Sequence, residues 1–228
     1  MSGEPYLCRL YLISPPTLVP SEFVLTLDNA LAAGDVAAFQ LRLKDASDDD
    51  IRAATKALMP VAHSHGVAFI INDRVDLVNE LGADGVHLGQ DDMAYADARH
   101  VLSEDKIIGV SCHDSAHLAM EAGEAGADYV AFGAFYPTKS KSPEKLAKYG
   151  TPTKAILENW TATTTVPAIA IGGMTPENCV ELVTAGADFI AAITAVWEHT
   201  LGPNMAVKEF NTAIKQGLKA RKPIATVD

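Results

Sequence analysis

Three segments of the chain repeat one short pattern, and this repeat constrains the fold more than any other feature. They read GADGVHLG from Gly82, GADYVAFG from Gly126 and GADFIAAI from Gly186. In each segment the glycine suits the end of a helix, Ala-Asp suits a turn, and the apolar residues that follow suit a buried strand. The repeat therefore predicts a fold built from successive helix-to-strand units.

Eight short β-rich runs lie along the chain, with helical segments between them. The runs are nearly continuous in hydrophobicity, as expected for a parallel sheet that is covered on both faces. They are LCRLYLIS, AAFQLRL, VAFIIN, GVHLG, IIGVS, YVAFGAF, VPAIAIGG and FIAAIT. The helical segments open near a Ser, Asp or Thr that suits a helix cap, and most close at a glycine; they include SEFVLTLDNALAAG, ASDDDIRAATKALMPVAHSHG, DSAHLAMEAGEAG and TPENCVELVTAG.

Eight strand-then-helix units predict an α/β fold, a single-domain (β/α)8 TIM barrel, for which about 250 residues is typical. A doubly wound open sheet is the alternative, because the number of strands does not show whether the sheet closes. The 12 prolines and 16 glycines are spread along the chain without a linker-like stretch. One barrel domain is therefore expected over residues 1–228, with short flexible termini at about 1–6 and 219–228.

Composition excludes several classes of protein. The chain is 48% hydrophobic and 21% charged, which excludes a disordered tail protein, and its net charge of −11 argues against nucleic-acid binding. The apolar run near the amino terminus lacks a preceding basic region and is broken by Pro15 and Pro16, so neither a signal peptide nor a membrane span is expected. Three cysteines without paired spacing suit reduced thiols, and together these features predict a cytoplasmic protein.

Polar residues follow the second β-rich run. Because side chains alternate along a strand, Gln40, Arg42 and Lys44 face one side, and Leu41 and Leu43 face the other. Buried cations are normally paired with anions or bound ligands, so this cluster predicts an anion site rather than a strand end that frays into water.

Acidic residues follow the third and fourth runs. Asn72 and Asp73 come after one, and Gly89 and Asp92 come after the next. Mg²⁺ takes one or two protein carboxylates and completes its octahedron with water and phosphate oxygens, so two aspartates beside a basic cluster suit a metal–diphosphate complex. His87 precedes the glycine, and we expect it to be a packed strand residue rather than a ligand.

The remaining strand ends carry hydroxyls, lysines and glycines. Ser111 follows the fifth run, where it suits either a ligand contact or a cap for the next helix. In many barrels the loops after the seventh and eighth strands form a phosphate cradle from glycine amides and a helix terminus. The other candidates are Thr138, Lys139, Ser140 and Lys141 in the long segment after the sixth run, Gly172 and Gly173 after the seventh, and Ile193 and Thr194 after the eighth.

With these residues in place, nearly the whole chain resembles the thiamine-phosphate synthase family. The resemblance implies a (β/α)8 barrel that joins hydroxymethylpyrimidine diphosphate to thiazole phosphate and releases pyrophosphate, with Mg²⁺ required. It implies that Asp73 and Asp92 bind the metal. The residues that it implies for the pyrimidine diphosphate are Gln40, Arg42, Lys44, Asn72, Ser111 and Lys141, and those for the thiazole phosphate are Thr138, Ser140, Gly173, Ile193 and Thr194.

The chain departs from the family pattern in a few places. Leu43 stands where Glu is usual, and Ser140 and Thr194 replace one hydroxyl residue by another, which keeps the hydrogen-bonding group. The segment 142–150, SPEKLAKYG, departs more.

The resemblance also implies a mechanism. Catalytic roles fall on Arg42, Lys44, Ser111 and Lys141: the cations, together with Mg²⁺, neutralise the departing pyrophosphate, and a pyrimidine cation is trapped by the thiazole nitrogen. Catalysis then comes from positioning and electrostatics.

Two alternatives remain open: a thiazole tautomerase-like relative, and a non-catalytic barrel that binds phosphorylated ligands. The expected partners are phosphorylated small molecules, with no nucleic acid and no membrane. The sequence leaves the oligomeric state open, and a homo-oligomer is compatible with it.

Overall fold

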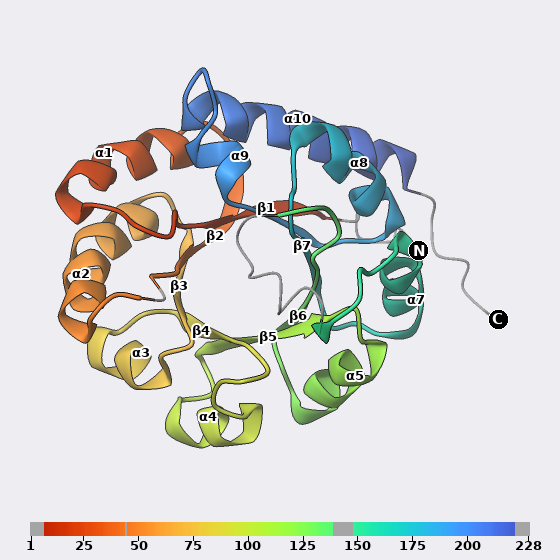
Figure 1. The fold of residues 1–228 in the computed structure, drawn as a ribbon, viewed down its shortest axis with the longest axis horizontal. Helices are drawn as coiled ribbons and strands as arrows, with labels where there is room; N and C mark the ends of the chain where they lie inside the picture. Colours follow the sequence, from red (N-terminus) through yellow and green to blue (C-terminus); the bar gives the residue numbers. More distant parts are fainter. Residues whose placement is uncertain (1–6, 44, 139–147, 222–228) are drawn as a thin grey trace.

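Eight parallel strands close into a barrel in the order of the sequence, and the helices surround it (Figure 1). The computed structural model describes residues 7–43, 45–138 and 148–221. The first and last strands pair with each other, with Leu10 opposite Ile190, so the predicted barrel is confirmed and the open sheet is excluded. The strands are β1 (Arg9–Ile13), β2 (Val36–Leu41), β3 (Ala68–Asn72), β4 (Gly85–Leu88), β5 (Ile107–His113), β6 (Tyr129–Phe132), β7 (Ala168–Ile171) and β8 (Phe189–Ala192).

Helices follow the strands and cover the outer face of the sheet. The long last helix packs on its neighbours at the closure of the barrel, α8 and α1 among them. The helices are α1 (Pro20–Leu31), α2 (Asp48–Ser64), α3 (Val75–Leu81), α4 (Tyr95–Val101), α5 (Ala116–Ala125), α7 (Lys154–Thr163), α8 (Pro176–Ala185), α9 (Thr194–Trp197) and α10 (Pro203–Ala220). No helix in the described ranges is both long and apolar enough to cross a bilayer.

Two separate apolar clusters result from the alternation of side chains along the strands. One fills the space between the sheet and the helices and includes the outward-facing Phe39, Leu41 and Val86. The other fills the barrel interior, where Ile13 and Tyr129 are almost fully buried. Because every strand is covered on both sides, the strands can be apolar along nearly their whole length, as the sequence indicates.

The GAD repeat forms the same structure three times at the amino ends of the strands. Gly82, Gly126 and Gly186 end α3, α5 and α8 with φ of 72°, 101° and 120°, values that L side chains rarely adopt. The aspartate that follows turns back to the neighbouring strand, and its carboxylate accepts a backbone N–H there. The three bonds are Phe69 N to Asp84 at 2.6 Å, Ile108 N to Asp128 at 2.8 Å and Ala168 N to Asp188 at 2.8 Å.

Side-chain caps are found for most of the helices for which the sequence predicts them. Ser47 and Thr175 form capping boxes at α2 and α8, and the Ser115 hydroxyl accepts the Leu118 amide at α5. The exception is α1, because Ser21, which opens the segment SEFVLTLDNALAAG, does not cap it. Its N-cap is Val19, which makes no side-chain cap, and Pro20 occupies the first turn, where its missing N–H costs nothing.

The ends of the chain bear on the predicted domain limits. Helix α10 ends at Ala220, so Lys219 and Ala220 are helical although they fall within the predicted flexible terminus. Residues 1–6 and 222–228 lie outside the described residues.

Candidate active site

The carboxyl ends of the strands surround one cavity. It is lined by residues from β1 to β7 and by several of the segments that follow the strands. Asp73 and Asp92 open into this same cavity, so the two aspartates predicted to share an ion do face a common space. We call this the first cavity; the predicted site residues that line it are Gln40, Arg42, Asn72, Asp73, Asp92 and Ser111. The predicted Lys44 and Lys141 lie outside the described residues.

A second cavity adjoins the first at the ends of β7 and β8. It is lined by Thr138, Gly173, Ile193 and Thr194, four of the five residues predicted for the thiazole phosphate. The fifth, Ser140, lies outside the described residues. Ile193 and Ile171 line both cavities, so the two spaces share an apolar wall.

A buried amide and a half-buried one form one side of the first cavity. Gln40 is 2% exposed, and its Nε2 donates to Asn72 Oδ1 over 2.7 Å. This bond joins the ends of β2 and β3 and holds the Asn72 side chain in one orientation. Two polar groups of the predicted pyrimidine site are therefore fixed before a ligand arrives.

Arg42 brings a positive charge to the same side of the cavity. Burial lowers the pKa of its guanidinium, while the carboxylates of Asp73 and Asp45 act in the opposite direction. Its backbone N–H donates to Ser14 Oγ over 2.9 Å, which fixes the chain where β2 ends. A guanidinium that burial has partly stripped of water gains more from a multivalent anion than an exposed one does.

The carboxylates in the first cavity fit a hard divalent cation. Asp73 has a φ of 64°, and its amide donates to His87 O over 2.9 Å. Asp92 Oδ2 accepts from the Gly89 amide over 2.7 Å, whereas the neighbouring Asp91 pairs with Lys148 at 3.5 Å. Among the described residues there is no cluster of three or more metal-binding side chains. Two aspartates suit Mg²⁺, which takes its remaining ligands from water and phosphate.

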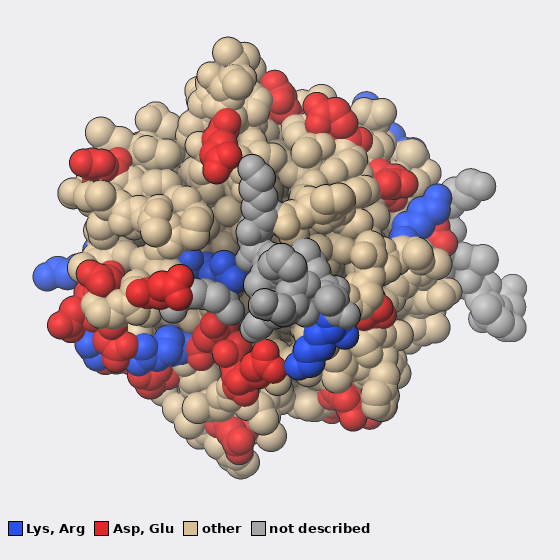
Figure 2. Space-filling view, viewed as in Figure 1, with Lys and Arg blue, Asp and Glu red and all other residues tan. Residues whose placement is uncertain are grey.

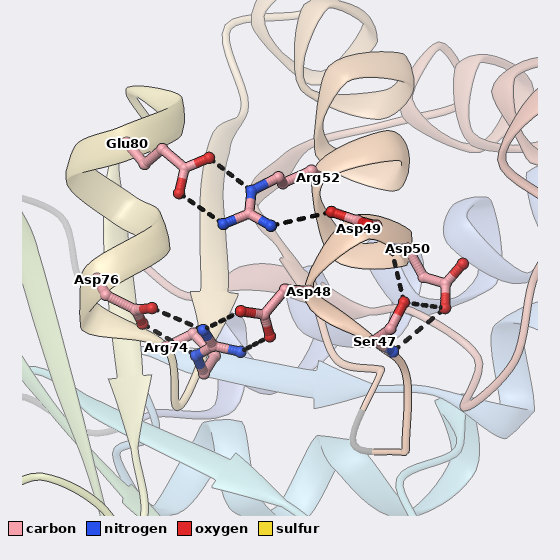
Figure 3. Close-up of polar contacts among 8 residues, drawn as sticks. All are labelled: Ser47, Asp48, Asp49, Asp50, Arg52, Arg74, Asp76 and Glu80. Carbon is pink, nitrogen blue, oxygen red and sulfur yellow. Dashed lines mark hydrogen bonds and ion pairs between the residues drawn. The ribbon is translucent and has the colours of Figure 1, made fainter.

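A network of ion pairs braces the loop that carries Asp73 (Figure 3). Arg74 binds Asp48 in the first turn of α2 and, at 2.6 Å, Asp76 in the first turn of α3. A second arginine, Arg52, joins the same helices through Glu80 at 2.6 Å. Arg74 lowers the pKa of both of its aspartate partners.

Sequence reasoning assigned no role to Arg74. Its position directly after Asp73 is the only pattern that could have suggested one.

The hydroxyl of Ser111 is hydrogen-bonded to His87, whose orientation the sequence predicts only in part. His87 lies on β4 as expected, but its side chain lines the first cavity and its Nε2 is 2.8 Å from Ser111 Oγ. The alternative role for Ser111 as a helix cap does not apply, because Ser115 caps α5. The spacing of two between His87 and Gly89 puts both on the same face of the strand, and this could have indicated that His87 faces the site.

Two aromatic rings stack at the edge of the first cavity. His113 and Tyr149 have ring centroids 3.5 Å apart at an interplanar angle of 7°, and both line the cavity. Tyr149 lies in the segment where the chain departs most from the family pattern, and no sequence pattern indicated this stack. It provides a flat aromatic surface beside the polar groups.

On the face where the strands end, acidic side chains form more of the visible charged surface than Lys and Arg do (Figure 2). A few Lys and Arg side chains lie among them. An anionic ligand approaching this face meets a net negative surface and therefore depends on local cations such as Arg42.

Comparison with known proteins identifies the family of the chain. The family model for thiamine monophosphate synthase matches residues 10–196. A thiamine-phosphate synthase of Rhodospirillum centenum is 52% identical over 208 residues, which cover 91% of this chain and 98% of that protein. One of Hyphomonas neptunium is 49% identical over 208 residues, with 89% and 92% covered.

A solved structure shares both the fold and part of the sequence. Thiamine phosphate pyrophosphorylase from Pyrococcus furiosus superimposes with a TM-score of 0.80 at 30% identity, covering 92% of this chain and 96% of that one. The family model spans all eight strands, and the relatives align over almost their full length. The chain therefore belongs to the thiamine monophosphate synthase family.

Proposed function

We propose that the two adjoining cavities bind the two substrates of a condensation between hydroxymethylpyrimidine diphosphate and 4-methyl-5-(2-hydroxyethyl)thiazole phosphate. The products are thiamine phosphate and pyrophosphate. Membership of the thiamine monophosphate synthase family makes the chain an enzyme, a transferase. The first cavity takes the pyrimidine diphosphate, and the second takes the thiazole phosphate.

One observation carries this assignment. The described residues predicted for the pyrimidine diphosphate line the first cavity, those predicted for the thiazole phosphate line the second, and the two cavities meet at Ile171 and Ile193. A condensing enzyme must hold the reacting carbon and nitrogen atoms of its two substrates within van der Waals reach of each other. The phosphate groups of both substrates must be held away from these atoms. A shared apolar wall between two polar cavities provides that arrangement.

The diphosphate is bound through charge and directed hydrogen bonds. Arg42 offers a guanidinium that can contact two phosphate oxygens at once, and Asn72 and Ser111 offer uncharged donors. Lys44 and Lys141, assigned from the sequence, add two further cations. Together these groups stabilise the charge that develops on the leaving oxygen.

The residues fit one essential Mg²⁺, which Asp73 and Asp92 would hold. When bound, the ion neutralises part of the diphosphate charge and thereby makes pyrophosphate a better leaving group. Both aspartates open into the first cavity next to Arg42, and this supports their role.

The reaction requires no nucleophile from the protein. The bond between the pyrimidine methylene carbon and the diphosphate oxygen breaks, and pyrophosphate leaves with the electron pair. The lone pair of the thiazole nitrogen then forms the new carbon–nitrogen bond. The protein contributes by holding the nitrogen over the methylene carbon, by excluding water that would trap the cation, and by stabilising the leaving group.

The decisive experiment supplies both substrates with Mg²⁺ and measures pyrophosphate and thiamine phosphate together. We expect equal amounts of the two products, and neither product when one substrate or the metal is omitted. Isomerisation of a thiazole phosphate in the absence of the pyrimidine would instead indicate a tautomerase. Tight binding of both ligands without product would indicate a non-catalytic barrel.

We also propose a cytoplasmic location and leave open assembly into a homo-oligomer. The described cysteines, Cys8, Cys112 and Cys179, are all unpaired and buried, as suits a reducing compartment. Light scattering of the purified protein would measure the oligomeric state directly.

A further inference from the structure

A chain of hydrogen bonds crosses the interior of the barrel and ends at the first cavity. Tyr11 Oη lies 3.0 Å from Tyr129 Oη, and Tyr129 Oη lies 3.0 Å from His87 Nδ1. The other ring nitrogen of His87 lies 2.8 Å from Ser111 Oγ. Four side chains from β1, β6, β4 and β5 are thereby connected, although the barrel interior around them is largely apolar.

The register of the strands leaves space for this series of hydrogen-bonded side chains. His87 on β4 lies opposite Gly109 on β5, and Gly109 lies opposite Tyr129 on β6. A Cβ atom at Gly109 would lie 1.9 Å from Cζ of Tyr129, so the tyrosine ring occupies the space that a side chain there would need. The ring passes across the glycine and stacks on His87 at an interplanar angle of 16°.

Both phenols keep their hydrogen. Tyr11 is 3% exposed and Tyr129 is 5% exposed, and burial raises the pKa of each phenol. Each hydroxyl therefore has one hydrogen to donate, and a buried hydroxyl that leaves its hydrogen without an acceptor destabilises the fold. In this series of hydrogen bonds each group therefore donates to the next in one of two possible directions.

The direction decides what Ser111 can do. If Tyr129 donates to His87 Nδ1, the neutral imidazole carries its hydrogen on Nε2 and donates it to Ser111 Oγ, and the serine hydrogen is then available to a ligand. In the opposite direction Ser111 donates to His87 and presents only lone pairs to the cavity. Diphosphate oxygens are acceptors, so only the first direction gives them a hydrogen bond from Ser111.

We propose that His87 is a positioning residue, and that Tyr11 and Tyr129 fix its tautomer so that Ser111 donates its hydrogen into the first cavity. The inference deepens the proposed function, because it assumes that an anionic diphosphate is the ligand facing Ser111. Its two supports are the continuous geometry of the chain and the glycine that accommodates Tyr129.

The tautomer can be observed without any turnover. The protein has seven histidines, so ¹⁵N-labelled imidazole signals can be assigned by comparison with a His87→Gln variant. We expect an Nδ1 of His87 without hydrogen and an Nε2 that carries one. Tyr129→Phe should shift the Nδ1 signal, and Tyr95→Phe, which removes a phenol bonded to Gly126 O outside the barrel, should not. A hydrogen on Nδ1 would overturn the proposal.

Kinetics test whether the orientation matters. The Gln side chain can place an amide N–H near the position of Nε2, whereas Met cannot donate. We expect His87→Met to lower kcat by about 10- to 100-fold, and His87→Gln to recover most of that loss. If the two variants are equally impaired while both melt like the wild type, His87 does not act through the donor that we propose.

A double-variant cycle separates an effect through Ser111 from a general effect on packing. Tyr129→Phe should lower kcat in the wild type but cause no further loss in a Ser111→Ala background. Equal losses in both backgrounds would overturn the proposal. If the wild type itself releases no pyrophosphate, the proposed function fails, and the imidazole spectra still decide the direction of the chain.

Discussion

The two ends of the barrel use aspartate in opposite ways. At the amino ends of the strands, Asp84, Asp128 and Asp188 each accept a backbone N–H from a neighbouring strand, and the arrangement recurs with each copy of the GAD repeat. At the carboxyl ends, Asp73 and Asp92 open into a cavity beside the guanidinium of Arg42. Aspartate thus satisfies backbone N–H groups at one end of the barrel and lines a ligand cavity at the other.

This difference separates stability from function. A carboxylate that accepts a strand amide satisfies a group that would otherwise be buried without a partner, and it therefore stabilises the fold. Carboxylates that converge on a cavity, together with a partly buried cation, do not contribute in the same way, because part of their interaction energy is obtained only when a ligand binds. We therefore expect substitutions at the two ends to affect different measurements.

The largest expected effect is on turnover, from Asp92→Asn. The amide keeps the size of the side chain but removes the charge that the metal needs. We expect kcat/KM to fall by about 10³-fold in pyrophosphate-release assays, with the melting temperature almost unchanged.

The neighbouring Asp91→Asn is a matched control for this variant. Asp91 is also exposed at the edge of the first cavity but pairs with Lys148, and its loss should cost less than about tenfold. If Asp91→Asn were the more damaging variant, the assignment of the metal carboxylate would be reversed.

Arg42→Met should give the next largest effect, and it tests whether activity and stability move in opposite directions. We expect kcat/KM to fall by about 10²-fold, because a charge-assisted bond to the diphosphate is lost. Burial already lowers the pKa of this guanidinium, so replacing it with an apolar side chain should leave the free energy of unfolding unchanged or raise it. Urea unfolding of both proteins without ligand would contradict this expectation if Arg42→Met were clearly less stable.

How far the sequence alone predicts the molecule also differs between the two ends. The repeated glycine and the apolar runs are local patterns, so the strands and the helix ends at these glycines follow from them, whereas closure of the sheet does not. The contact between Arg74 and Asp48 joins residues 26 positions apart, and the bond between His87 and Ser111 joins residues 24 positions apart. They depend on the register of paired strands and on the approach of α2 and α3, which no local pattern specifies. Side-chain alternation predicted that Gln40 faces inward, but it could not show that Asn72 is its partner.

Asp128→Ala should affect stability rather than turnover. Its carboxylate accepts from the Ile108 amide at 2.8 Å and from Arg99 at 3.0 Å. Removing it leaves a strand amide without a partner, and we expect a loss of about 1–3 kcal/mol. For a chain of this size, each kcal/mol lowers the melting temperature by roughly 2–4 °C. Activity per folded molecule should stay within about twofold, and a lower value would mean that the amino ends also shape the site.

Arg74→Gln should have a smaller effect that depends on pH. Arg74 lowers the pKa of Asp48 and Asp76 below the ordinary value of 3.8, so its pairs stabilise the fold above that pH. As the pH falls below 3.8, the carboxylates take up protons and this contribution disappears. Wild type and Arg74→Gln should therefore differ in urea unfolding near neutral pH and converge in acid. A gap that widened in acid would contradict the pairing.

Asp188→Asn should give the smallest effect, with the opposite dependence on pH. Burial raises the pKa of Asp188 above 3.8, so the folded protein holds this proton to a higher pH than the unfolded chain does. Stability must then fall as the pH rises from 3.8 through the raised pKa, because the folded state binds more protons over that interval. Asparagine does not titrate and can still accept the Ala168 amide. The free energy of unfolding of Asp188→Asn, relative to that of the wild type, should therefore increase with pH across this interval and become constant above it. Opposite slopes at Arg74 and Asp188 would establish that the carboxylates at the two ends of one barrel are tuned in opposite directions, whereas parallel slopes would mean that a single general electrostatic effect governs both.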